Sequence, residues 1–116
     1  MSRIYIDYLR DMHENANRAI KFIEGMDYDT FSKDEKTVYA VIRAVEIIGE
    51  ATRNIPEEIR AKYPEIPWRD ASDMRNKLVH RYFGINLEVI WQTLNEDLPM
   101  LATGLQEIIR WEEKKP

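Results

Sequence analysis

Apolar residues recur at three- and four-residue spacing along most of the chain, which is the pattern of amphipathic helices. The first such stretch runs from about Arg3 to Glu24, and Gly25 is placed to end it. Its apolar positions are Ile4, Tyr8, Met12, Ala16, Ala19, Ile20 and Ile23. No stretch shows the strict alternation that indicates a β-strand. The pattern therefore predicts an all-α fold.

A second helix is predicted to begin at a capping box formed by Ser32 and Glu35 and to run to about Asn54. Apolar residues cover nearly its whole circumference, which leaves only a narrow charged stripe. The stripe consists of Arg43, Glu46, Glu50 and Arg53. Such a helix is buried on two sides, so it lies centrally in a bundle or in an oligomer interface.

Prolines and glycines delimit two further helices. Pro56 suits the first turn of a short third helix that ends near Tyr63. A fourth helix is predicted from Pro67 and Trp68, with Gly84 at its end. The connections between these helices are short, which favours neighbours that run antiparallel.

The last helix is predicted from Leu87 towards Trp111, with Asn86 as its cap. Pro99 should kink or divide it, because proline removes a backbone donor inside a helix. The expected fold is thus an up-and-down bundle of four to five helices. With 116 residues in total, the chain has the length of a single domain over residues 1–116.

Composition narrows the class of protein. Hydrophobic residues make up 44% and charged residues 33%, a globular mixture without the bias of a disordered chain. The chain has no cysteine, which excludes disulfides and thiolate metal sites. Its apolar runs are too short for a membrane span, and the charged N-terminus lacks the apolar core of a signal peptide. We therefore expect a cytoplasmic protein without membrane association.

Positive charge is concentrated in one segment, although the net charge of the chain is −4. Residues 69–83 contain four basic and two acidic side chains, whereas the segments on both sides are net negative. A local basic patch can bind an anion even in an acidic protein. The alternative is an ordinary solvated helix face, and charge alone does not decide between the two.

Arg75 occupies an unusual position in the predicted fourth helix. It falls inside the apolar stripe, between Leu78 and Val79. An arginine there needs a carboxylate, a partner subunit or an anionic ligand, because burying it unpaired is costly. The simplest partner is Glu46 or Glu50 of the second helix.

His80 and Tyr82 follow Arg75 at spacings with different consequences. On a regular helix Tyr82 shares the face of Arg75, whereas His80 points ~140° away, on the side of Asn76. Arg75 and His80 converge only if the helix loosens near Gly84 or if two chains meet at this segment. Each residue also has an ordinary interpretation: a core tyrosine, and a histidine near a helix C-terminus.

Other motifs with a recognised chemistry are missing from the sequence. There is no HExxH, Walker or GxGxxG pattern, and His13 has no metal-site spacing around it. We interpret His13 as a surface residue and the carboxylates outside the stripe as solvated. No cofactor or metal is expected.

The stretch MRNKLVHRYFGIN resembles the signature of the HEPN superfamily, and more narrowly the R-x4-H-x-Y form of HepT-like toxins. The runs AVEIIGEATRNIPEEIRAKYPEIPWRD and LEVIWQTLNEDLPML are similar to the same family, so the resemblance extends from Tyr8 to Leu101. The bare arginine-x4-histidine pattern is weak. Its context, with IIGEA upstream and YFGI downstream, makes it specific.

The resemblance implies a HEPN-like helical bundle that dimerises with its motifs facing each other. It implies a metal-independent endoribonuclease, acting on RNA as the toxin of a type VII-like toxin–antitoxin pair. The implied antitoxin is a minimal nucleotidyltransferase that attaches adenylate groups to Tyr82. Arg75 and His80 would be the catalytic pair, and Asn76 would assist them.

Two other functions remain open from the sequence. The same residues can serve a non-catalytic, nucleotide- or partner-binding subunit of a nucleotidyltransferase complex, or the chain can be a structural dimer without a ligand. The intact motif favours the enzyme.

Overall fold

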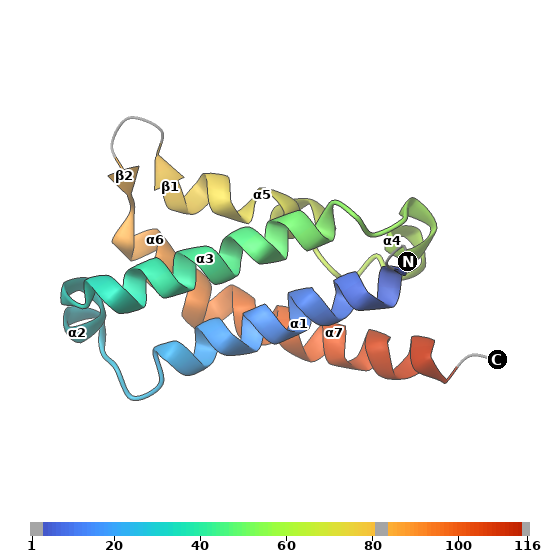
Figure 1. The fold of residues 1–116 in the computed structure, drawn as a ribbon, viewed down its shortest axis with the longest axis horizontal. Helices are drawn as coiled ribbons and strands as arrows, with labels where there is room; N and C mark the ends of the chain where they lie inside the picture. The colour runs from blue at the N-terminus through green and yellow to red at the C-terminus, as the bar shows by residue number, and fades with distance from the viewer. Residues whose placement is uncertain (1–3, 81–83, 115–116) are drawn as a thin grey trace.

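A computed structural model describes residues 4–80 and 84–114, and for residues 77–80 and 85 it describes the backbone alone. The all-α architecture expected from the periodicity is confirmed (Figure 1). In chain order the elements are α1 (Tyr5–Phe22), α2 (Tyr28–Lys33), α3 (Glu35–Thr52), α4 (Glu57–Lys62), α5 (Trp68–Leu78), β1 (Val79–His80), β2 (Gly84–Ile85), α6 (Leu87–Gln92), the π-helical turn η1 (Thr93–Asp97) and α7 (Leu98–Glu113).

The long helices pack side by side in the order α5, α3, α1, α7, so α3 lies between α5 and α1 (Figure 1). Its buried side chains include Val41, Ala44, Val45 and Ile48. The prediction that this helix is covered on two sides is confirmed, and both sides are covered within the bundle. Among the described residues, no helix is both long and apolar enough to cross a bilayer.

The start of α3 differs from the prediction. Asp34 is the N-cap, and its carboxylate accepts a hydrogen bond from the backbone N–H of Thr37 at 3.1 Å. Ser32 belongs instead to the short helix α2, where its hydroxyl donates to the carbonyl of Asp29. The capping-box assignment was wrong because Ser32 and Asp34, two residues apart, both carry capping side chains, and the aspartate is the one that caps α3.

The fourth helix is shorter than predicted. It ends at Leu78, and the chain then forms an antiparallel pair in which Val79 is opposite Ile85 and His80 is opposite Gly84. Gly84 has a φ of +79°, the left-handed conformation that glycine adopts without strain. Two-residue strands are too short to produce an alternating pattern, which is why the sequence did not reveal them.

The C-terminal helical region follows the prediction closely. Asn86 caps α6 by accepting a hydrogen bond from the backbone N–H of Val89 at 3.2 Å. The helical path is interrupted by η1 immediately before Pro99, which lies in the first turn of α7. The expected division at Pro99 is confirmed, and the π-helical turn accommodates the lost backbone donor.

Candidate functional site

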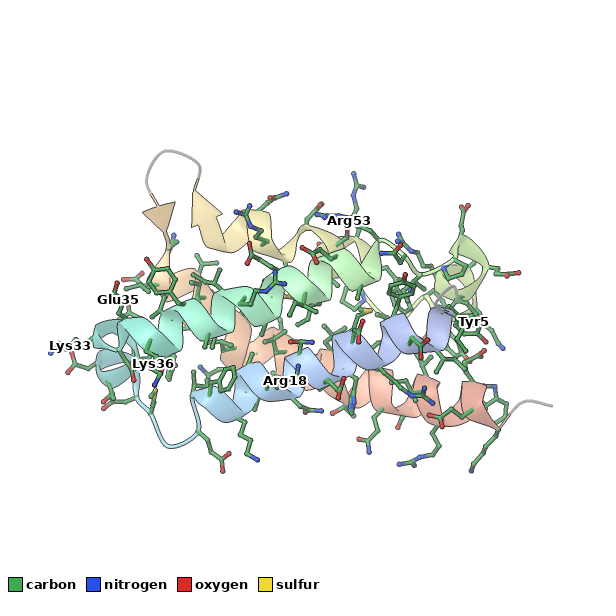
Figure 2. All side chains as sticks on the ribbon, in the orientation of Figure 1. Tyr5, Arg18, Lys33, Glu35, Lys36 and Arg53 are labelled. Carbon is green, nitrogen blue, oxygen red and sulfur yellow. The ribbon has the colours of Figure 1, made fainter. Side chains whose placement is uncertain are left out.

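The junction between α3 and α5 positions the arginine of the motif. Gly49 is buried there, and a Cβ atom at this position would lie 3.1 Å from the carbonyl oxygen of Ser72. The same carbonyl accepts a hydrogen bond from Nη2 of Arg53 at 3.2 Å, and Figure 2 labels Arg53 at the C-terminal end of α3. The absence of a side chain at Gly49 thus lets α5 approach α3 closely, and Arg53 holds it there.

Arg75 forms an ion pair across this junction. Its Nε donates to Oε2 of Glu46 at 2.9 Å, while Nη1 of Arg43 lies 3.9 Å from Oε1 of the same carboxylate. Of the two partners predicted for Arg75, Glu46 and Glu50, Glu46 is the one that it contacts. The side chain of Arg75 is 49% exposed, so it lies at the edge of the apolar stripe rather than buried within it as expected.

This arrangement suits anion binding. A guanidinium has five N–H donors, and the pair with Glu46 uses the one on Nε. The terminal nitrogens, Nη1 and Nη2, form the fork that matches a phosphate. Glu46 orients the side chain of Arg75 from α3. Arg43 lies within one helical turn of Glu46 and adds a second positive charge to the junction.

The structure places the other motif residues differently from a continuous helix. The backbone of His80 lies in β1, beyond the end of α5. The angle of ~140° that separates Arg75 and His80 on a regular helix therefore does not apply. Asn76 is exposed on α5, and Tyr82 lies outside the described residues. The expected shared face of Arg75 and Tyr82 stays a prediction, because Tyr82 lies outside the described residues.

His13 forms no part of this junction. One of its ring nitrogens, Nε2, lies 3.1 Å from Nδ2 of Asn17, one turn further along α1. In the part of the chain that the structure describes, no group of three or more histidine, aspartate or glutamate side chains is arranged to hold a metal ion.

A second polar cluster, which the sequence did not reveal, lies at the opposite end of the bundle. The carboxylate of Glu112 is buried and accepts hydrogen bonds from the hydroxyls of Tyr5, at 2.6 Å, and Tyr63, and it pairs with Nζ of Lys62 at 2.9 Å. The prediction that carboxylates outside the charged stripe are solvated was wrong for Glu112. A signal existed: Glu112 continues the apolar spacing of Leu101, Leu105 and Ile108.

Both tyrosines of this cluster are shifted towards their neutral forms. The hydrogen bond to the Glu112 carboxylate, with a smaller effect of burial, raises the pKa of Tyr5. Burial and the bond to Glu112 raise the pKa of Tyr63. The cluster joins α1, the α4 region and α7, and its saturated hydrogen bonding indicates a structural role.

Comparisons with known proteins match nearly the whole chain. The family model described as "Ribonuclease HepT-like" matches residues 12–108. A protein of Thermococcus cleftensis named "Probable ribonuclease HepT" is 46% identical over 93% of this chain and 98% of its own length. A candidate RNase of Methanocaldococcus jannaschii is 45% identical over 89% of this chain and 85% of its own length. A candidate RNase of Caldanaerobacter subterraneus is 37% identical over 91% of this chain and 95% of its own length. No solved structure matches the chain.

Proposed function

The chain belongs to the Ribonuclease HepT-like family, and from that premise we propose that it is an endoribonuclease whose single HEPN-type domain covers residues 1–116. The observation that carries the proposal is the half-exposed guanidinium of Arg75, held by Glu46 through Nε. It lies five residues before His80, as in the family signature. We propose Arg75 and His80 as the catalytic pair and Asn76 as a supporting residue.

The proposed reaction needs no metal-activated water, because RNA carries its own nucleophile. The 2′-hydroxyl attacks the adjacent phosphorus, the bond to the 5′-oxygen breaks, and a 2′,3′-cyclic phosphate remains. An imidazole with a pKa near neutrality can accept the 2′-proton or protonate the leaving oxygen, worth ~10²–10⁴-fold. The guanidinium of Arg75 stabilises the negative charge of the pentavalent phosphorus. We therefore propose activity independent of metal ions.

We further propose that two chains assemble with their α5 segments facing each other, so that both motifs line one cleft. The two-sided apolar surface of α3 no longer argues for an oligomer interface, because both of its apolar sides are covered within the bundle. The proposal now rests on the family resemblance and on the exposure of Arg75 and Asn76 on α5.

The biological role that we propose is that of a cytoplasmic toxin. Its antitoxin would be a minimal nucleotidyltransferase that adenylylates Tyr82. The added group brings bulk and negative charge into the basic segment 69–83, of which Tyr82 is part. There it would repel RNA and compete for the arginines. In this scheme the modification of Tyr82 regulates the activity, and Tyr82 takes no part in the proton transfer. A tyrosine side chain, with a pKa of about 10 in model peptides, is a poor proton carrier at pH 7.

A second candidate function is a non-catalytic subunit that binds a nucleotide or a partner protein. The Arg75–Glu46 ion pair favours a partner-binding subunit of this kind, because a carboxylate partner weakens the attraction of the guanidinium for the phosphates of RNA. The candidates differ in whether the purified chain cleaves RNA.

The test compares the purified protein with its His80→Ala and Tyr82→Phe variants in the presence of EDTA. The EDTA concentration is on the order of millimolar, well above that of any contaminating metal ion. We expect cleavage by the wild type and by Tyr82→Phe, and none by His80→Ala. After incubation with the nucleotidyltransferase and ATP, only Tyr82→Phe should remain active. Loss of wild-type cleavage in EDTA, with recovery in magnesium, would contradict the metal-independent mechanism. Inactivity of a folded Tyr82→Phe variant would place the tyrosine in the chemistry.

A further inference from the structure

Tyr39 is an exposed aromatic side chain on α3, the helix that holds Arg75. It is 62% exposed, so its ring offers a flat apolar surface to a ligand. In the described part of the chain, the other exposed large apolar side chains lie in or beside α1 and α7, namely Ile4, Phe22, Met100 and Trp111. One turn before Tyr39, the exposed side chains of Glu35 and Lys36 carry opposite charges, which nearly cancel (Figure 2).

Tyr39 shares the exposed side of α3 with Arg43 and Glu46. The spacings of four and seven residues place the three side chains within ~60° of one another around the helix. Glu46 pairs with Arg75, so the ring lies ~10 Å along the helix axis from that ion pair, with Arg43 between them. An extended nucleotide chain bound at Arg75 can therefore reach Tyr39.

The motif runs towards Tyr39, because α5 is antiparallel to α3. Ser72 lies beside Gly49, and Arg75, three residues later on α5, pairs with Glu46, three residues earlier on α3. β1 continues from α5 in the same direction, towards the end of α3 that α2 precedes (Figure 1). Tyr39 therefore lies in the half of α3 towards which the motif extends.

The charges on the exposed side of α3 favour the same direction for a polyanion. Arg43 is 63% exposed, and its contact with Glu46 is long, at 3.9 Å, so its guanidinium can also bind a phosphate. In the opposite direction Glu50 is exposed and would repel a phosphate. A strand bound at Arg75 therefore continues more favourably over Arg43 and Tyr39 than over Glu50.

We propose that the substrate is single-stranded RNA that follows the exposed side of α3, with one base stacked on Tyr39 and a phosphate bound by Arg43. This inference rests on the proposed ribonuclease function and adds the substrate class to it. Stacking on a side chain needs a base whose face is free, and the neighbouring base pairs of a duplex cover that face. Every base has such a face, so Tyr39 positions the strand without selecting a sequence.

The test measures RNA binding in the His80→Ala background, in which the strand stays intact. Three probes are compared by fluorescence anisotropy: a mixed-sequence single strand, its duplex, and an abasic chain that keeps the ribose phosphates but lacks the bases. Tyr39→Leu should weaken binding of the single strand about 10-fold, as expected for one lost stacking contact. It should leave binding of the duplex and of the abasic chain unchanged.

Two further variants show whether the aromatic ring itself is responsible. Tyr39→Phe should bind all three probes as the parent does, because the ring remains. Trp111→Ala is the matched control, since it removes a ring of the same exposure, 62%, from α7. It should also bind as the parent does.

The salt dependence of binding separates Arg43 from Tyr39. Loss of one phosphate contact lowers the slope of log affinity against log salt concentration by about 0.7 for a single strand. Arg43→Gln should show this decrease, whereas Tyr39→Leu should keep the slope of the parent. Arg18→Gln, at an exposed arginine of α1 (Figure 2), is the control and should also keep it.

Unchanged binding of the single strand by Tyr39→Leu, or an equal loss for the abasic chain, would overturn the proposal. Sedimentation of Tyr39→Leu should match that of the parent, and a changed assembly state would overturn the proposal in favour of a contact between chains. Cleavage by the chain with His80 intact tests the proposed ribonuclease function separately. Failure of that function and failure of the Tyr39 contact therefore give different results.

Discussion

Two glutamates contact several basic or hydroxyl groups in this bundle, and they differ in their exposure to solvent. Glu112 is 3% exposed, and its carboxylate is surrounded by Tyr5, Tyr63 and Lys62. Glu46 is 30% exposed at the side chain and contacts Arg75 and Arg43 at the surface of the α3–α5 junction. Buried polar networks rigidify a fold, whereas an exposed ion pair can exchange one partner for a ligand.

The contrast assigns different roles to the two ends of the molecule (Figure 1). Near the chain termini, Glu112 joins α1, the α4 region and α7 through hydrogen bonds that are protected from water. Near the β1–β2 pair, Glu46 holds an arginine that still faces solvent. We expect substitutions at the first end to change stability and substitutions at the second to change RNA cleavage.

The largest effect on stability is expected for Glu112→Ala. Removing the carboxylate leaves a lysine and two tyrosine hydroxyls without their acceptor, which should cost about 3–5 kcal/mol of unfolding free energy. The control is Glu113→Ala, which removes an exposed pair with Arg10 and should cost less than about 1 kcal/mol. Urea unfolding measures both, and equal losses in the two variants would show that burial does not distinguish these carboxylates.

Glu46→Ala should affect catalysis more than stability. Stability should fall by no more than about 1 kcal/mol, because the pair with Arg75 is partly exposed. Cleavage should fall about 10- to 100-fold, since a guanidinium displaced by 1 Å no longer meets the phosphate correctly. Glu50→Ala, on the same exposed stripe of α3, is the control and should retain full activity. Unchanged cleavage in Glu46→Ala would remove Glu46 from the site.

Two glycines with similar backbone conformations offer a matched pair. Gly25 and Gly84 have φ values of +80° and +79°, and among the described residues, apart from the chain neighbours, no atom lies within 4 Å of a Cβ added at either position. Alanine should therefore cost about 1 kcal/mol at each position through backbone strain alone. Only Gly84→Ala should also reduce cleavage, because Gly84 pairs with His80. Equal activity of the two variants would separate the β1–β2 pair from the catalytic site.

The smallest effect is expected at alkaline pH. Tyr5 and Tyr63 have raised pKa values in the fold, so their neutral forms stabilise it. This contribution to stability is complete below about pH 10, the pKa of tyrosine in the unfolded chain. It is lost as the pH rises through the raised pKa values of the folded chain. Thermal unfolding between pH 8 and 11 should show a decline that is shallower in Tyr5→Phe. An identical decline in that variant would mean that Tyr5 does not contribute.

The sequence predicted most helices because their stabilising contacts repeat with the helical period. Val41, Val45 and Ile48 define the buried side of α3 in this way, and Asn86 marks the start of α6 through a local hydrogen bond. The approach of α5 to α3 at Gly49 was not predictable, since it depends on the carbonyl of Ser72, 23 residues later.

The site was predictable in its residues more than in its geometry. The pair between Arg75 and Glu46 followed from helical wheels and the cost of an unpaired arginine. The end of α5 before His80 was not predictable, because the β1–β2 pair depends on backbone pairing between His80 and Gly84, which leaves no periodic signal in the sequence. The Glu112 cluster was missed because its partners lie 49 and 107 residues away in the sequence.

The central claim, that this chain cleaves RNA through His80 and Arg75, is tested most directly on matched oligonucleotides. A mixed-sequence RNA pool and its 2′-O-methyl counterpart are incubated with the wild type and with His80→Ala, and the products are analysed by mass spectrometry. We predict fragments ending in 2′,3′-cyclic phosphate from RNA with the wild type alone, and intact 2′-O-methyl oligonucleotide throughout. Equal cleavage of both pools, or wild-type cleavage by a folded His80→Ala variant, would contradict the claim.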